Sequence, residues 1–299
     1  MMSEDLIKKY YPTKEELEQL GDYADMECVF DDDADIQEND IPLPVATDNP
    51  KSSEIVETIS RAVIMGEPEE FLSYIWENID LLDSLSAIDE SVKDVIELGY
   101  KYYIARGIGA SACDFGALHY SGLIFEQDYA KAKELYEIAV DLGSAQALIN
   151  LGYIYEYGRV GEPDYDKAFE IYARAAALIG NFESLYKLGD MYSRGKAVKK
   201  DMKAAVSLWL KSYDVSENPL ERGHSAFRLA KLVVKPEADD FGLTYDPLAA
   251  LNLFQEAEFG FRLEIKNGAS YYEKNMKKAI EGQKQARDLL DCTFILNRV

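Results

Sequence analysis

The amino-acid sequence predicts an all-α solenoid, in which helix-turn-helix repeats stack on one another. First, residues of one type recur about every 36 positions, and a fixed period of roughly 20 to 50 residues is typical of repeat architectures. Second, from residue 52 onward the apolar residues follow the three- and four-residue spacing of helices. Third, no stretch of useful length alternates between apolar and polar residues, as a strand would. Four series keep the period: Tyr100, Tyr136, Tyr172 and Trp209; Gly122, Gly158 and Gly195; Asp128, Asp164 and Asp201; Ala132, Ala168 and Ala205.

Residues 1–51 are predicted to form an acidic N-terminal arm and linker that is partly disordered. Dense like charge and proline both oppose a packed element. The residues that indicate this are Asp31, Asp32, Asp33 and Asp35, followed by Pro42, Pro44 and Pro50.

The solenoid is expected over residues 52–299, and its first helix has Ser53 as a candidate cap. The next helix begins at Pro68, because proline suits the first turn of a helix, and its apolar face continues to Leu82. A third helix follows, and residues 71–107 together form a degenerate repeat.

Three clear repeats come next, each with a first helix, a glycine-containing loop and a second helix. A divergent repeat with an insert at about residues 235–245 follows, and a charged helix is expected to cap the stack. The predicted ranges are 108–143, 144–180 and 181–216 for the clear repeats, 217–262 for the divergent repeat and 270–290 for the capping helix.

The recurring residues have structural explanations. Glycine inside a helix costs roughly 1 kcal/mol relative to alanine, so Gly116, Gly152 and Gly189 are expected where a neighbouring helix packs closely. The alanine series is expected to permit close packing on the second helices, and the aromatic series is expected to fill the space between hairpins. The other glycine series ends the first helices in a left-handed conformation, and the aspartate series caps the second helices.

Residues 151–176 combine these features in a pattern that resembles the Sel-one-like repeat, a relative of the tetratricopeptide repeat. The next repeat resembles it with Trp209 in the last aromatic position, and the preceding repeat has His119 in a tyrosine position. The resemblance implies a right-handed α-superhelix whose first helices line a concave groove, and it implies a role as a protein-binding adaptor or scaffold. The residues that match are Leu151, Gly152, Tyr155, Gly158, Asp164, Lys167, Ala168, Tyr172, Ala175 and Ala176.

The charge of the chain is strongly acidic and unevenly distributed. The formal net charge is −23, and residues 1–100 contain 6 basic and 27 acidic residues, a net charge of −21. The remaining 26 basic and 28 acidic residues give a net charge of −2. A nucleic-acid ligand is not expected, because phosphate binding needs a basic field.

A cytoplasmic location without membrane association is expected. No apolar run reaches the roughly 18 residues that a membrane helix needs. The first twelve residues lack the basic segment and apolar core of a secretory signal. Cys28, Cys113 and Cys292 are odd in number and far apart, which is typical of reduced thiols.

No catalytic residue, metal site or cofactor is predicted, and the chain is interpreted as non-enzymatic. Gly107-Ile108-Gly109 resembles a dinucleotide-binding motif, but a helix precedes it where the motif needs a strand. His119 and His224 are the two histidines of the chain and are far apart in the sequence, which disfavours a transition-metal site.

The predicted partner-binding residues are first-helix side chains that packing does not use, because these should face the groove. Tyrosine is favoured in binding surfaces for its large area and polar tip. A basic loop follows one of these helices and could meet an acidic partner or this protein's own acidic arm. Its residues are Arg194, Lys196, Lys199, Lys200 and Lys203. The groove is expected to bind a protein or peptide partner through Asn150, Tyr153, Tyr157, Lys187, Asp190 and Arg194.

Two other functions are alternatives. The first is an inhibitory or immunity-type regulator that uses its acidic N-terminal third against a basic site of a partner. The second is a hydrolase with its site in the insert at residues 235–245, although no nucleophile and base lie together there.

Overall fold

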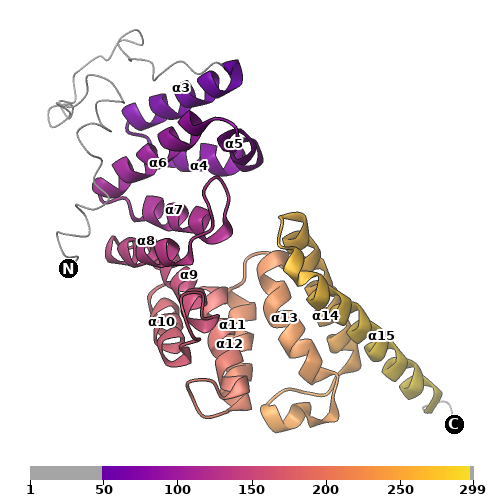
Figure 1. The fold of residues 1–299 in the computed structure, drawn as a ribbon. Coiled ribbons are helices and arrows are strands. Elements are labelled where there is room, and N and C mark those ends of the chain that lie inside the picture. Colours follow the sequence, from indigo (N-terminus) through magenta and orange to yellow (C-terminus); the bar gives the residue numbers. More distant parts are fainter. Residues whose placement is uncertain (1–48, 297–299) are drawn as a thin grey trace. The chain divides into compact units, whose positions relative to one another are not determined.

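A computed structural model describes residues 49–296, and all of their regular elements are helices (Figure 1). The prediction of an all-α chain of successive helix-turn-helix units is therefore confirmed. The described residues fall into two compact units. Unit 1 extends to Ile154 and includes Arg159–Gly161, and unit 2 consists of Tyr155–Gly158 and the residues from Glu162 onward. The acidic arm predicted for residues 1–51 lies outside the described part except for its last three residues, and it stays a prediction.

Unit 1 begins with a helical region that precedes the clear repeats. Helix α7 packs against α8, and α3 packs against α6. The last two residues of α9 belong to unit 2. The helices are α3 (Pro50–Ile64), α4 (Pro68–Glu77), α5 (Ile79–Ser86), α6 (Glu90–Ala105), α7 (Gly109–Ser121), α8 (Tyr129–Asp141) and α9 (Ala145–Glu156).

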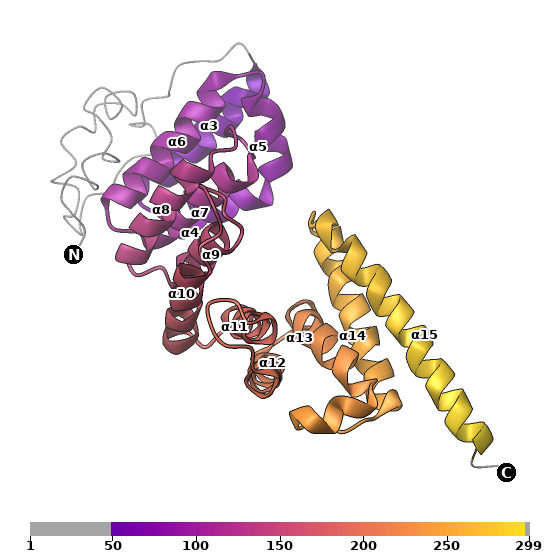
Figure 2. The ribbon, with the colours of Figure 1, turned by 60° about the horizontal axis from the view of Figure 1, so that its bottom comes forward.

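Unit 2 continues the succession of helical hairpins. Helix α11 packs against α12, α13 against α14, and α15 along α14 (Figure 2). The elements are α10 (Tyr165–Leu178), α11 (Phe182–Arg194), α12 (Met202–Val215), α13 (Pro219–Val233), the 3-10 helix η3 (Pro236–Phe241), α14 (Pro247–Lys266), the 3-10 helix η4 (Ser270–Tyr272) and α15 (Glu273–Leu296).

Aspartates begin the second helices of the repeats, as the sequence predicts. The Asp128 carboxylate accepts hydrogen bonds from the backbone amides of Ala130 and Lys131, both at 2.9 Å. Asp164 and Asp201 cap α10 and α12 in the same way. Each carboxylate satisfies amides that have no partner within the helix and complements the helix dipole.

Glycines in the first helices lie against aromatic rings of the second helices. A Cβ atom at Gly189 would lie 2.5 Å from Trp209 Nε1 and 3.1 Å from the carbonyl oxygen of Ala205. A Cβ atom at Gly116 would lie 2.7 Å from the ring of Tyr136. Because no larger residue fits at these separations, the glycines permit the two helices of a hairpin to approach closely.

The remaining repeated residues are buried or end a helix. Gly122 and Gly195 have φ values of 75° and 68°, in the left-handed region that glycine adopts without strain. Gly158, just after α9, also has a positive φ of 59°. Ala132, Ala168, Ala205, Tyr172 and Gly152 are all buried.

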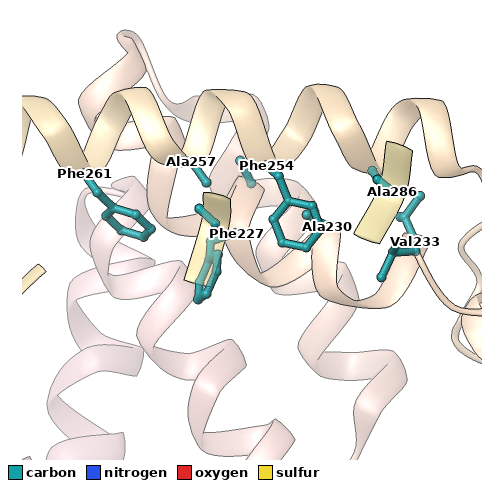
Figure 3. Close-up of a cluster of buried hydrophobic side chains, with 11 residues drawn as sticks. Phe227, Ala230, Val233, Phe254, Ala257, Phe261 and Ala286 are labelled. Carbon is teal, nitrogen blue, oxygen red and sulfur yellow. The ribbon is translucent and has the colours of Figure 1, made fainter. Parts of the chain in front are cut away.

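Apolar side chains from α13, α14 and α15 form the core of the C-terminal part of unit 2 (Figure 3). The rings of Phe227 and Phe261 meet edge to face with centroids 5.5 Å apart. Phe254 lies against α15 at Gly282, where a Cβ atom would overlap its ring. Ala286, one turn further along α15, is fully buried in the same cluster.

The first helix begins earlier than its predicted cap at Ser53. Helix α3 starts at Pro50, and the Asn49 side chain accepts a hydrogen bond from the amide of Lys51 at 3.1 Å. Proline fits the first helical position because its fixed φ is helical and its missing N–H would have no partner there. The prediction of a Ser53 cap is therefore wrong.

The helix predicted from Pro68 to Leu82 is two helices, separated at Asn78. The Asn78 side-chain amide donates a hydrogen bond to the carbonyl oxygen of Tyr74 at 2.9 Å. Asparagine competes with helical backbone bonds in this way. At the other end of the chain, α15 runs to Leu296, beyond the predicted end of the capping helix at residue 290. The predicted insert at residues 235–245 contains the short helix η3.

Candidate functional site

The six predicted groove residues do not form one cluster within either unit. Asn150 and Tyr153 lie in the part of α9 that belongs to unit 1. Tyr157 follows α9 directly, and it belongs to unit 2 together with Lys187, Asp190 and Arg194 of α11. Within unit 2 the structure brings Tyr157 together with Lys187, and Asp190 together with Arg194.

The two predicted residues in unit 1 are partly buried. The Asn150 amide donates to the sulfur of Cys113 at 3.5 Å, and Tyr153 is half-buried. Burial raises the pKa of the Cys113 thiol to about 12, and the Asp114 carboxylate adds to this shift. Cys113 is therefore a packing residue at neutral pH rather than a nucleophile.

Lys187 is part of a buried ion pair. Its ammonium lies 2.9 Å from the Glu156 carboxylate, and the two side chains are only 6% and 5% exposed. The Tyr172 hydroxyl donates to the same carboxylate at 3.0 Å. A buried charge is tolerated only when it is paired and hydrogen-bonded, and both partners meet that condition here.

Lys187 also positions the exposed side chain of Tyr157. Its ammonium donates to the Tyr157 hydroxyl at 3.0 Å and lies 4.9 Å from the centroid of the ring. Tyr157 nevertheless remains 49% exposed. The hydroxyl and the ring of Tyr157 therefore both contact a buried charge, while about half of the side chain remains exposed.

Asp190 forms the second buried ion pair, with Arg228 of α13. Two guanidinium nitrogens of Arg228, Nε and Nη2, donate to the two carboxylate oxygens at 2.5 and 2.6 Å. Burial raises the pKa of the Asp190 carboxyl, but the charge and hydrogen bonds of Arg228 outweigh burial, so the pKa lies below its ordinary value. Arg194 approaches the same carboxylate at 3.4 Å, and its side chain is 54% exposed.

An aromatic ring lies against the Arg228 side chain of the Asp190–Arg228 pair. The guanidinium carbon of Arg228 lies 4.5 Å from the centroid of Tyr186, and this ring stacks on His224 with centroids 4.8 Å apart. His224 Nε2 lies 3.1 Å from the Glu264 carboxylate. Arg228 is thus fixed by a carboxylate and an aromatic ring at the same time.

The sequence interpretation did not identify Glu156 and Arg228, the partners of the two buried pairs. Glu156 precedes Lys187 by 31 residues, and Arg228 follows Asp190 by 38. Both separations are close to the length of one repeat. The sequence signal for these pairs was therefore two opposite charges about one repeat length apart on successive first helices. Glu156 at the end of α9 pairs with Lys187 of α11, and Asp190 of α11 pairs with Arg228 of α13.

Within residues 49–296, no group of three or more His, Cys, Asp or Glu side chains is placed to hold a metal ion. None of the helices in this part of the chain is long and apolar enough to span a membrane.

A family model described as the Sel1 repeat matches residues 109–144, 145–178 and 182–214. The chain contains three Sel1 repeats. They span the successive helices α7 and α8, α9 and α10, and α11 and α12, and they cover about a third of the chain. The resemblance seen in the sequence is confirmed over these residues. Sel1 repeat proteins generally act as protein-interaction scaffolds and are typically not enzymes.

Two solved structures are similar to the chain. One is a crystal structure of a Sel1 repeat protein from Oxalobacter formigenes, with 19% identity, a TM-score of 0.48, and coverage of 78% of this chain and 99% of that one. The other is a protective antigen present in uropathogenic Escherichia coli strains that displays an SLR fold, with 20% identity, a TM-score of 0.41, and coverage of 79% of this chain and 64% of that one. A comparison with curated protein sequences found no match.

Proposed function

We propose that this chain is a non-enzymatic scaffold that binds a polypeptide partner on the face formed by its first helices. In unit 2 this face consists of the end of α9 together with α11 and α13, and we call it the first-helix face. The observation that supports the proposal most strongly is the ladder of two ion pairs, Glu156–Lys187 and Asp190–Arg228, which joins successive first helices.

The ladder gives Lys187 and Asp190 a supporting role beneath the face. Their side chains are almost fully buried and already paired, whereas Tyr157 and Arg194 are about half exposed above them. Tyrosine and arginine are enriched among the residues that dominate binding energy. Because the buried pairs already restrict these two side chains, less conformational entropy is lost when a partner binds.

The test begins with peptides selected from a displayed library against the 299-residue chain. The double variant Tyr157→Ala, Arg194→Ala should bind the selected peptides at least about tenfold more weakly, which corresponds to about 1.4 kcal/mol. The matched control is Tyr245→Ala, Lys211→Ala, because these two exposed residues also provide a tyrosine and a cation but lie outside the first helices. Selected peptides that bind both variants as tightly as the wild type would show that the first-helix face is not the binding site.

The alternative is regulation through the acidic N-terminal third. It is supported by the net charge of −21 over residues 1–100, which would favour a basic site on a partner. Deleting residues 1–51 separates the two functions. Binding to the first-helix face should survive the deletion, whereas inhibition by the acidic arm should be lost. The hydrolase alternative has no further support.

A further inference from the structure

Four cations gather on one side of unit 2, although the chain as a whole is strongly acidic. Arg194 lies at the end of α11, Arg228 and Lys231 lie one turn apart in α13, and Lys278 lies in α15. We call these four residues the cationic patch. Arg194 and Arg228 share the Asp190 carboxylate, and Lys231 lies one turn from Arg228. Helix α15, which carries Lys278, packs along α14 and also contacts α13. Loss of water around the ammonium, followed by the charge of Arg228, lowers the pKa of Lys231.

The carboxylate beside the patch does not neutralise it. Asp190 pairs with both Arg228 and Arg194, so these two cations share one negative charge. Glu273 and Glu281 line the same surface hollow as Lys278 but form no ion pair with it. Lys231 and Lys278 have no carboxylate oxygen within 4.0 Å among residues 49–296. The Lys231 ammonium instead lies 4.8 Å from the centroid of the Phe227 ring.

The four cations differ in how many hydrogen-bond donors they can offer to a ligand. Arg228 already donates two hydrogen bonds to Asp190 and a third to the carbonyl oxygen of His224. It therefore contributes charge but few free donors. Lys231 and Lys278 are exposed, and each retains ammonium protons for a ligand.

We propose that the cationic patch receives an acidic segment of the polypeptide partner, whose carboxylates pair with Lys231 and Lys278. This inference rests on the proposed function and specifies the chemistry of the partner. A carboxylate placed there would relieve the repulsion among the four cations and form charge-assisted hydrogen bonds. The attraction acts locally, because charges separated by more than about 8 to 10 Å are largely screened at physiological salt.

A second basic segment provides a matched control. Lys199 and Lys200 lie in the loop between α11 and α12, and both are exposed. They carry the same charge as Lys231 and Lys278 but lie outside the cationic patch. Replacing either pair with glutamine removes two charges and keeps most of the aliphatic side chain.

The experiment measures fluorescence anisotropy of a labelled ten-residue peptide with five glutamates, titrated with the 299-residue chain. The same peptide with glutamine in place of glutamate is the ligand control. We expect Lys231→Gln, Lys278→Gln to weaken binding of the glutamate peptide at least tenfold, and Lys199→Gln, Lys200→Gln to change it less than twofold. Raising the salt from about 50 to 150 mM should also weaken binding, as expected for exposed charges.

The inference would be overturned by equal binding of the two peptides, by loss of binding in Lys199→Gln, Lys200→Gln alone, or by unchanged binding in Lys231→Gln, Lys278→Gln. A single-stranded oligonucleotide that binds the patch more tightly than the glutamate peptide would overturn the assignment to a polypeptide. Helical circular dichroism of each variant checks that it folds. The display-selected peptides separate this inference from the proposed function. If their binding requires Tyr157 and Arg194 but is unchanged by Lys231→Gln, Lys278→Gln, and if they contain no acidic residue, this inference is contradicted and the proposed scaffold function is not.

Discussion

The contact between α13 and α14 allows no side chain at Gly260, and this gives a sharp prediction. A Cβ atom at Gly260 would lie 2.6 Å from the carbonyl oxygen of Pro219 and 2.9 Å from the Cα atom of Gly223. Both are backbone atoms, so rotation of a side chain cannot relieve the overlap. Ordinary contacts of a Cβ atom begin near 3.4 Å, so Gly260→Ala requires the two helices to separate by about 0.8 Å.

The expected magnitude is the difference between two effects. Overpacking of a tight contact costs about 1–3 kcal/mol, and the backbone contacts at Gly260 place the cost at the upper end. Replacing glycine by alanine within a helix returns about 1 kcal/mol. We therefore expect a net loss of about 2 kcal/mol, which lowers the melting temperature by about 4–8 °C in a domain of roughly 150–250 residues.

Thermal unfolding followed by circular dichroism at 222 nm measures this effect. The control is Gln255→Ala, on the exposed side of the same helix, which should change stability by less than about 0.5 kcal/mol. Melting of Gly260→Ala at or above the temperature of the wild type would refute the close approach of α13 and α14.

Three further predictions follow from buried groups. Glu156→Ala should destabilise the protein by about 3–5 kcal/mol in chemical denaturation, because it leaves the Lys187 ammonium buried without its carboxylate partner. The double variant Glu156→Leu, Lys187→Met should recover most of that loss. Burial, followed by the charge of Lys131, lowers the pKa of His119 from 6.5 to about 4. The contribution of His119 to folding stability is therefore complete above pH 6.5 and is lost as the pH falls toward 4. His119→Phe should flatten the dependence of the free energy of unfolding on pH between these values, and an unchanged slope would contradict the assignment. Iodoacetamide at pH 8 should alkylate exposed Cys292 quickly and buried Cys113 only after unfolding, as mapped by mass spectrometry.

The repeats could be predicted from the sequence because their structural residues recur at a fixed spacing. The aspartate caps and the glycines that meet aromatic rings depend on neighbours within one hairpin, and the same neighbours appear in the next hairpin. Gly189 against Trp209 is an example, since Gly116 meets Tyr136 in the same way. Because each hairpin needs the same cap and the same close contact, the residues that provide them recur and can be recognised in a single sequence.

The buried ion pairs could not be predicted in the same way. Lys187 and Asp190 are charged residues on a helix, and such residues are almost never fully buried unless they are paired. Their partners Glu156 and Arg228 lie about one repeat away and occur in one repeat each, so no series marks them. The break at Asn78 was missed for a related reason, because neither proline nor glycine interrupts the apolar pattern there.

The most direct test of the scaffold proposal is site-specific photo-crosslinking on the first-helix face. The photoreactive residue p-benzoylphenylalanine replaces Tyr157 in one variant and Glu170, an exposed residue of the second helix α10, in another. Each variant is irradiated with a peptide selected against the wild-type chain, and the adducts are quantified by mass spectrometry. The proposal predicts an adduct from position 157 and none above background from position 170. Adducts from position 170 alone, or equal adducts from both positions, would contradict binding on the first-helix face.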